Sequence, residues 1–169
     1  ITTFTIPEDG SSITNIATLE HDSQNSGQAN NKLLKLYDNT YVLAYKSGGN
    51  TGYLKTFTIP TDGSSITEVD SLIMFTSSSS QITTKGLIKI DNNTFFRKGT
   101  TYSISSDGSV IEKVKGHGAG SNSDRSTIAS VHVEGDIYAS VGRNKVSTFN
   151  ISADGSAATT VAELDYTNH

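Results

Sequence analysis

A twelve-residue segment occurs twice in this chain of 169 residues, and this repetition constrains the fold more than any other sequence feature. Residues 3–14 read TFTIPEDGSSIT and residues 56–67 read TFTIPTDGSSIT, so the copies differ only where Glu8 becomes Thr61. Weaker copies follow near residues 101–109 and 148–156. The aromatic residues shared by the four copies, spaced 53, 45 and 47 residues apart, are Phe4, Phe57, Tyr102 and Phe149. A period of about 40 to 50 residues indicates an array of equivalent structural units.

Each repeat has the sequence pattern of short β-strands. Residues 54–59 place large apolar side chains at alternate positions, which is the period of a half-buried strand rather than a helix. Asp62-Gly63 then supplies a tight turn, because glycine adopts a positive φ at low cost, and the alternation resumes at Ile66. A second pattern over residues 33–45, with a turn at residues 38–40, predicts another strand pair. Each unit therefore contains four short antiparallel strands.

The predicted fold is all-β, a β-propeller-like array of about three and a half four-stranded antiparallel blades. We expect residues 1–169 to form one repeat domain, with a half-blade at 1–20 and complete blades near 32–75, 86–117 and 127–166. A single blade cannot bury both of its faces, so it needs neighbours on either side. Propellers typically have about 4 to 8 blades. We therefore expect these residues to be part of a longer chain whose strands complete the half-blade.

Charge and composition exclude several classes of function. The net charge of -4 arises from 17 acidic and 13 basic residues without a basic stripe, so we expect no nucleic-acid partner. No apolar run approaches the roughly 20 residues that cross a bilayer, so we expect no membrane insertion. The absence of cysteine excludes disulfides and zinc-thiolate sites. The glycine-rich residues 116–120 lack the lysine of a phosphate loop, and we predict no cofactor.

Several segments resemble the repeats of large secreted or surface propeller-like proteins from marine bacteria and environmental sequences. These segments are YVLAY at 41–45, GYLKTFTI at 52–59, DGSSIT at 62–67 and LEHD at 19–22. The resemblance is strongest in residues 1–75 and weak after about residue 95. It implies an extracellular or cell-surface location, and it carries no catalytic residues to transfer.

Two histidines are candidate ligand-binding residues. His21 and His117 both follow the fourth strand of a blade, on the connection to the next blade. Propellers commonly place ligands on the surface formed by such connections, so the two side chains are predicted on one face. Solvated loop positions are the alternative. The four histidines are too scattered for a local metal signature, and we predict no metal site.

The turn between the second and third strands of the first complete blade offers a second candidate site. Tyr45 and Tyr53 flank residues 47–51, which include Asn50, and aromatic rings beside polar side chains suit carbohydrate binding. The alternative is that both tyrosines pack between sheets.

No set of catalytic residues stands out. No Gly-x-Ser-x-Gly elbow is present, and spacing cannot choose a pair among Asp22, Asp70, Asp124 and Glu134. The favoured hypothesis is a non-enzymatic extracellular repeat module with a structural, adhesive or ligand-binding role, whose partner is a carbohydrate or another surface protein. The alternatives are a propeller hydrolase or lyase acting on polysaccharide and a fragment of a virion or cell-surface fibre.

Overall fold

The computed structural model describes residues 1–24, 31–48, 51–76, 86–97, 99–117, 129–142 and 144–166. These residues form fourteen β-strands and no α-helix, so none of them could cross a membrane as a helix. The half-blade contains β1 (Thr2–Thr5) and β2 (Thr14–Thr18). The first blade contains β3 (Lys32–Tyr37), β4 (Thr40–Lys46), β5 (Thr51–Thr58) and β6 (Thr67–Thr76).

Two further four-stranded sheets follow in the chain. The second blade contains β7 (Leu87–Lys89), β8 (Thr94–Arg97), β9 (Thr100–Ile104) and β10 (Ile111–Gly116). The third blade contains β11 (Ala129–Glu134), β12 (Ile137–Val141), β13 (Lys145–Ile151) and β14 (Ala158–Asp165). In every sheet each strand pairs antiparallel with the next along the chain.

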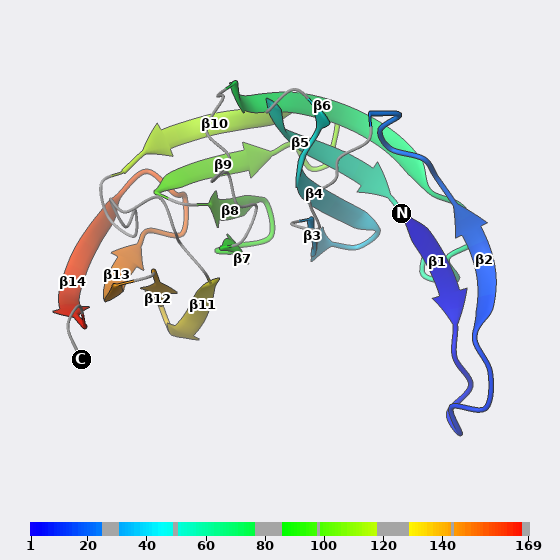
Figure 1. Cartoon of the computed structure of the whole chain (residues 1–169). Coiled ribbons are helices and arrows are strands. Elements are labelled where there is room, and N and C mark those ends of the chain that lie inside the picture. The colour runs from blue at the N-terminus through cyan, green and yellow to red at the C-terminus, as the bar shows by residue number, and fades with distance from the viewer. Residues whose placement is uncertain are drawn as a thin grey trace.

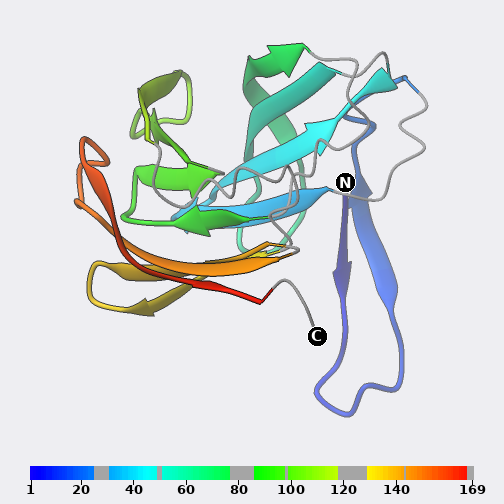
Figure 2. The ribbon, with the colours of Figure 1, turned by 60° about the vertical axis from the view of Figure 1, so that its left-hand side comes forward.

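The sheets stand side by side along an arc, as propeller blades do. Figure 1 shows β3, β7 and β11 on the inner side of the arc and β6, β10 and β14 on its outer side. The β1–β2 hairpin lies at one end and extends away from the blades, as Figure 2 shows from a second direction. The predicted all-β, propeller-like array of four-stranded blades is therefore confirmed.

The four repeated aromatic residues occupy one register position, as their spacing predicts. Phe4 pairs with Asn15, and Phe57 pairs with Glu68, on equivalent strand pairs. The register of each pair shifts beside the aromatic residue, which marks a β-bulge between it and the preceding threonine. Consecutive residues of a strand point to opposite faces, so the aromatic ring and that threonine face opposite neighbours in the array.

Hydrophobic clusters fill the space between successive sheets. Phe57 and Ile59 of the first blade pack with Leu19 from the half-blade side. The opposite face of the first blade, including Val42 and Leu54, packs against the second blade. A third cluster joins the second and third blades through Phe96 of one and Phe149 of the other, with ring centroids 5.1 Å apart. Each blade is therefore stabilised by its neighbours rather than by a core of its own.

A hydrogen bond between neighbouring blades accompanies each cluster. The hydroxyl of Thr56 donates to the carbonyl of Gly108, in the turn between β9 and β10, at 2.7 Å. Gly108 has a φ of +77°, a conformation that favours glycine, and a Cβ built there would lie 3.4 Å from a threonine methyl group of the first blade. Glycine is thus favoured at this turn by its backbone conformation.

Candidate functional site

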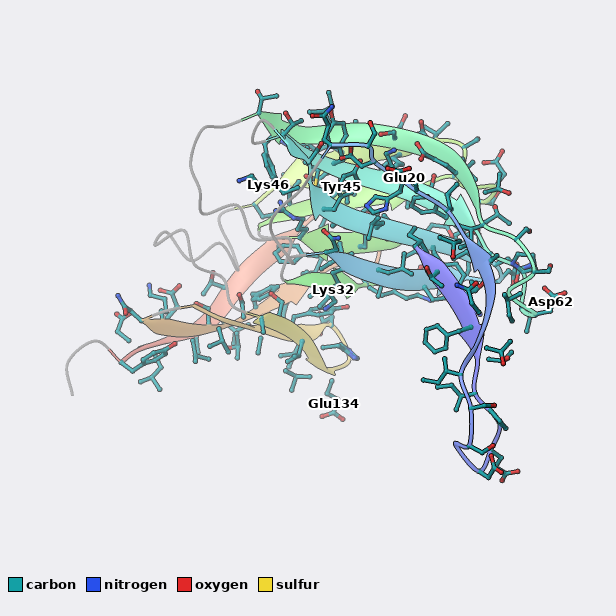
Figure 3. All side chains as sticks on the ribbon, turned by 45° about the vertical axis from the view of Figure 1, so that its right-hand side comes forward. Glu20, Lys32, Tyr45, Lys46, Asp62 and Glu134 are labelled. Carbon is teal, nitrogen blue, oxygen red and sulfur yellow. The ribbon has the colours of Figure 1, made fainter. Side chains whose placement is uncertain are left out.

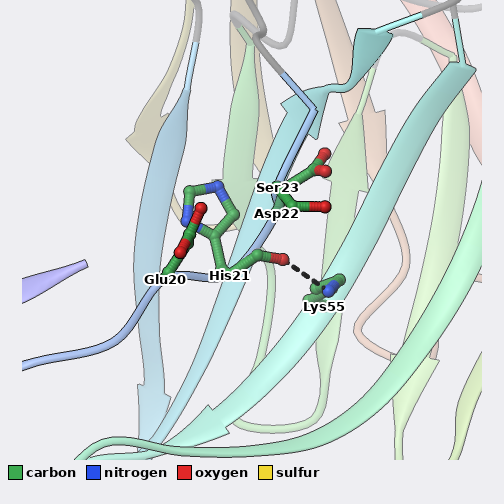
Figure 4. Close-up of a pocket in the computed structure, with 5 residues that line it drawn as sticks. All are labelled: Glu20, His21, Asp22, Ser23 and Lys55. Carbon is green, nitrogen blue, oxygen red and sulfur yellow. Dashed lines mark hydrogen bonds between the residues drawn. The ribbon is translucent and has the colours of Figure 1, made fainter.

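The connection that follows β2 forms one wall of a surface pocket of about 420 Å³. Figure 4 shows its lining, which consists of Glu20, His21, Asp22, Ser23 and Lys55. The first four residues are consecutive, and the fifth projects from β5 of the first blade. In Figure 3, Glu20 lies near Tyr45, at the opposite end of the blade from Asp62 in the β5–β6 turn. The pocket therefore lies where the half-blade connection crosses the first blade.

Lys55 fastens the connection to the first blade. Its ammonium group donates to the backbone carbonyl of His21 at 2.7 Å and lies 2.9 Å from Glu68 Oε2 on β6. The same ammonium group lies 5.9 Å from the centroid of the Tyr45 ring. The side chain of Lys55 is only 14% exposed. Its charge is consequently held beside the pocket, next to the Glu68 carboxylate.

His21 contributes a half-buried imidazole to the same pocket. Its ring meets the Tyr45 ring edge-on, with centroids 4.8 Å apart at 87°. Burial lowers the pKa of His21, and the positive charge of Lys55 acts in the same direction. The buried Nε2 atom has no hydrogen-bond partner among the described residues. The pKa of the imidazole therefore lies below its ordinary value of about 6.5, and the ring is mainly uncharged at neutral pH.

Asp22 places a carboxylate beside this imidazole. Burial opposes the charged form of Asp22, but hydrogen bonds from the Ser47 side chain and the Gln24 backbone N–H outweigh it and lower the pKa. Burial and the Asp22 charge together raise the pKa of the Tyr45 hydroxyl, which stays protonated at neutral pH. The pocket thus combines a neutral imidazole, an ionised carboxylate and an ammonium group.

The structure gathers three of the five residues that the sequence predicted for ligand binding. His21 contacts Tyr45, and the Tyr45 ring stacks on Tyr53 with centroids 5.5 Å apart at 18°. Tyr45 is only 2% exposed, so its ring packs inside the molecule. Tyr53 is half-buried beside it. Asn50 lies outside the described residues.

His117 does not join His21 in the pocket but lies at the interface between the second and third blades. Its Nε2 atom lies 3.1 Å from Thr101 Oγ1 and 3.1 Å from the carbonyl of Gly155. These two groups also bond to each other across the interface between the second and third blades. The reason is that β10 ends at Gly116, so the histidine meets the neighbouring sheet directly.

Sequence reasoning missed Lys55, although a signal was present in the repeat. The residue two positions before each repeated aromatic is Thr2, Lys55, Thr100 and Ser147, so a charge occurs at this position in one copy alone. A departure from a repeat at one position indicates a local role for that residue. Glu20 and Ser23, by contrast, follow no pattern that identifies them. Among the described residues, no three His, Asp or Glu side chains gather as metal ligands would.

Comparison with known proteins identifies the fold. No protein-family model and no curated protein matches the sequence. A solved protein from Lactobacillus plantarum matches 97% of this chain with a TM-score of 0.66 at 14% identity. A provisionally named 6-phosphogluconolactonase from Bacteroides fragilis matches 96% of the chain with a TM-score of 0.57 at 16% identity. The chain spans 50% and 51% of these two proteins, about half their length.

These likenesses correct the expectation about function. The hypothesis of a non-enzymatic extracellular repeat module is wrong, since one of the structures that share this fold carries the name of an enzyme and none of the findings indicates adhesion. The reason for the error is physical. The hypothesis rested on the lack of a local catalytic motif, whereas a propeller brings ionisable groups together from separate strands and connections.

Proposed function

We propose that this chain is part of a propeller hydrolase that acts on the lactone of a small anionic sugar acid. The fold shared with a provisionally named 6-phosphogluconolactonase supports a lactone as substrate. The pocket of about 420 Å³ is of a size that suits a single sugar unit rather than a polymer chain.

The observation that carries this proposal is the half-buried, neutral imidazole of His21 in the same pocket as the Lys55 ammonium group. A general base must be unprotonated at the operating pH, and an uncharged histidine meets that requirement. A partly buried ammonium group attracts a phosphate or carboxylate and stabilises negative charge that develops on oxygen.

The proposed reaction is addition of water to the lactone carbonyl. His21 accepts a proton from the attacking water while the water oxygen bonds to the carbonyl carbon. The negative charge that forms on the carbonyl oxygen is stabilised by Lys55. When the tetrahedral intermediate collapses, the ring C–O bond breaks and the histidine returns the proton to the leaving alkoxide. The product is the open-chain hydroxy acid.

The test compares hydrolysis of two lactones, 6-phosphoglucono-δ-lactone and glucono-δ-lactone, followed by acid release in weakly buffered solution. We expect the unaltered chain to exceed the spontaneous rate and to favour the phosphorylated lactone. His21→Gln should lower the rate by about 10² to 10⁴-fold for both lactones, because it removes the base. Lys55→Met should remove the preference for the phosphorylated lactone.

His132→Gln is the matched control. His132 is exposed on β11 and bonds to the nearby Gly135 carbonyl, far from the pocket in the sequence and on another blade. This variant should retain the full rate. Hydrolysis of both lactones at only the spontaneous rate by the unaltered chain, or a fully active His21→Gln variant, would refute the proposal.

A further inference from the structure

The four hairpin turns that carry the repeated Asp-Gly pair differ in how they hold the aspartate. All four contain the sequence Asp-Gly-Ser, in residues 7–11, 60–64, 105–109 and 152–156. In each turn the serine N–H donates to the aspartate Oδ1 at 3.0 Å, and the glycine N–H donates to the carbonyl three residues earlier at 2.8–2.9 Å. The first residue is proline in the first two turns and serine in the last two. We call them the proline turns and the serine turns.

The first serine of a serine turn holds the aspartate side chain and also closes the turn. Ser105 Oγ donates to Asp107 Oδ1 at 2.6 Å and accepts the Val110 N–H at 2.9 Å. The Ser105 N–H donates to the Val110 carbonyl at 3.0 Å. The equivalent bonds of Ser152 measure 2.7, 2.9 and 3.0 Å. These bonds form the serine clamp, which favours the ionised carboxylate and lowers the pKa of Asp154 to about 2.

Proline cannot supply this clamp in the proline turns, because it has neither a hydroxyl nor a backbone N–H. Asp62 Oδ1 accepts the Ser64 N–H, and this bond is the chief cause that lowers the pKa of the Asp62 carboxyl. Asp62 is exposed in the turn between β5 and β6 (Figure 3). The aspartates of the serine turns are exposed as well, so access of water does not distinguish the two kinds of turn. The clamp does.

We propose that the aspartates of the proline turns, Asp9 and Asp62, isomerise spontaneously to isoaspartate, whereas the serine clamp protects those of the serine turns. The amide nitrogen of the following glycine attacks the aspartate Cγ and forms a C–N bond. The protonated carboxyl group loses its hydroxyl, which leaves as water together with the amide proton, and a five-membered succinimide results. Water then opens the succinimide at either carbonyl, which returns aspartate or yields isoaspartate of the same mass.

The clamp slows the first of these steps. Attack requires a protonated carboxyl group whose carbon is free to turn towards the glycine nitrogen, so each hydroxyl bond to the carboxylate must break first. One such bond corresponds to about two- to tenfold in rate. The clamp bonds lie within each hairpin, so the difference does not depend on which blades stand beside it. The proposal is independent of the proposed catalytic activity.

The test is incubation of the full chain at neutral pH and physiological temperature for several weeks. Peptide mapping with electron-transfer dissociation then separates isoaspartate from aspartate at each turn. Isoaspartate should accumulate at Asp9 and Asp62 about two- to tenfold faster than at Asp107 and Asp154. The serine turns are matched controls within the same molecule, because their Asp-Gly-Ser sequence is identical. In urea, where the clamp is lost, all four sites should react at similar rates.

Two variants exchange the clamp between the turns. Pro60→Ser supplies the missing hydroxyl and N–H and should slow isomerisation at Asp62 while leaving Asp9 unchanged. Ser105→Ala removes the hydroxyl and should speed isomerisation at Asp107 by about two- to tenfold while leaving Asp154 unchanged. Circular dichroism establishes that each variant is folded.

Several results would overturn the proposal. These are equal rates at the four sites of the folded chain, faster reaction in the serine turns, or a difference that persists in urea. Failure of both variants to change the rate at their own site would overturn it too. So would the absence of isoaspartate from the proline turns of the folded chain under conditions in which the unfolded chain forms it.

Discussion

Replacement of Thr56 by valine is the most direct test of how neighbouring blades are held together. Thr56 is completely buried, and its hydroxyl donates at 2.7 Å to the carbonyl of Gly108, which is also buried. Valine keeps the shape of threonine and replaces the hydroxyl with a methyl group. The substitution therefore leaves the glycine carbonyl without its donor, which costs about 1–3 kcal/mol in the free energy of unfolding.

Thr148→Val is the matched control because it makes the same chemical change at the same register position of the third blade. The Thr148 side chain has no hydrogen-bond partner among the described residues, so its loss should change the free energy of unfolding by less than about 0.5 kcal/mol. Urea unfolding is followed by far-ultraviolet circular dichroism at a protein concentration where sedimentation shows only monomer. The two variants should have the same m-value, so the difference between their midpoints reports the hydrogen bond.

Two results would refute this reasoning. Equal destabilisation by Thr56→Val and Thr148→Val would show that the threonine matters within its own strand rather than across the interface. No destabilisation by Thr56→Val would show that the interface hydrogen bond contributes nothing net to the folded state.

Three further predictions concern the turns and the pocket. Gly10→Ala and Gly155→Ala should each cost about 1–2 kcal/mol in urea unfolding because both φ angles are positive; Gly155→Ala should cost more, since its Cβ would lie 2.9 Å from a threonine methyl group, and equal losses would contradict this. Serine hydroxyls and a backbone N–H lower the pKa of Asp154 to about 2, so its contribution to stability, complete above about pH 4, is lost as the pH falls through 2. Between pH 6 and 2 the Tm should depend less on pH in Asp154→Asn than in the unaltered chain. The same dependence of Tm on pH in both proteins would contradict a stabilising role for the Asp154 carboxylate. The folded-state pKa of His21 lies below its ordinary value, so its contribution to stability is complete above about pH 6.5 and falls as the pH drops through the folded pKa. An NMR titration of the imidazole should show a midpoint below 6.5 that rises in Lys55→Met, and a midpoint that falls in this variant would contradict the assigned cause.

The fold could be predicted because its information is local and repeated. The spacing of Phe4 and Phe57, the alternation of residues 54–59 and the Asp-Gly turns each concern a few neighbouring residues, and each occurs in several copies. Local patterns of this kind determine strand, turn and face. The assignment of one strand position to all four aromatic residues followed from their spacing alone.

The pocket could not be predicted in the same way because its contacts join distant parts of the chain. Lys55 meets His21 across 34 residues, and the hydrogen bond ends on a backbone carbonyl, which no side-chain motif reveals. His21 was identified as a candidate from its place after a fourth strand. Tyr45 lies on β4 of the first blade, and nothing in the sequence indicates that its ring touches the His21 ring. His117 takes the register position of Leu19 rather than that of His21, because the backbone N–H groups of Leu19 and His117 bond to equivalent carbonyls of the adjacent strands. It therefore meets a different neighbour.

The hydrogen bonds between blades also bear on how such a chain lengthens during evolution. Thr3, Thr56 and Thr101 donate to the carbonyls of Gly63, Gly108 and Gly155 in the next blade. Each of these threonines lies seven residues before the turn glycine of its own blade, as Thr3 does before Gly10. Any duplicated gene segment that encodes a whole repeat therefore brings both halves of the contact with it, ready to join the units on either side. Such a segment would keep this hydrogen bond on both of its sides.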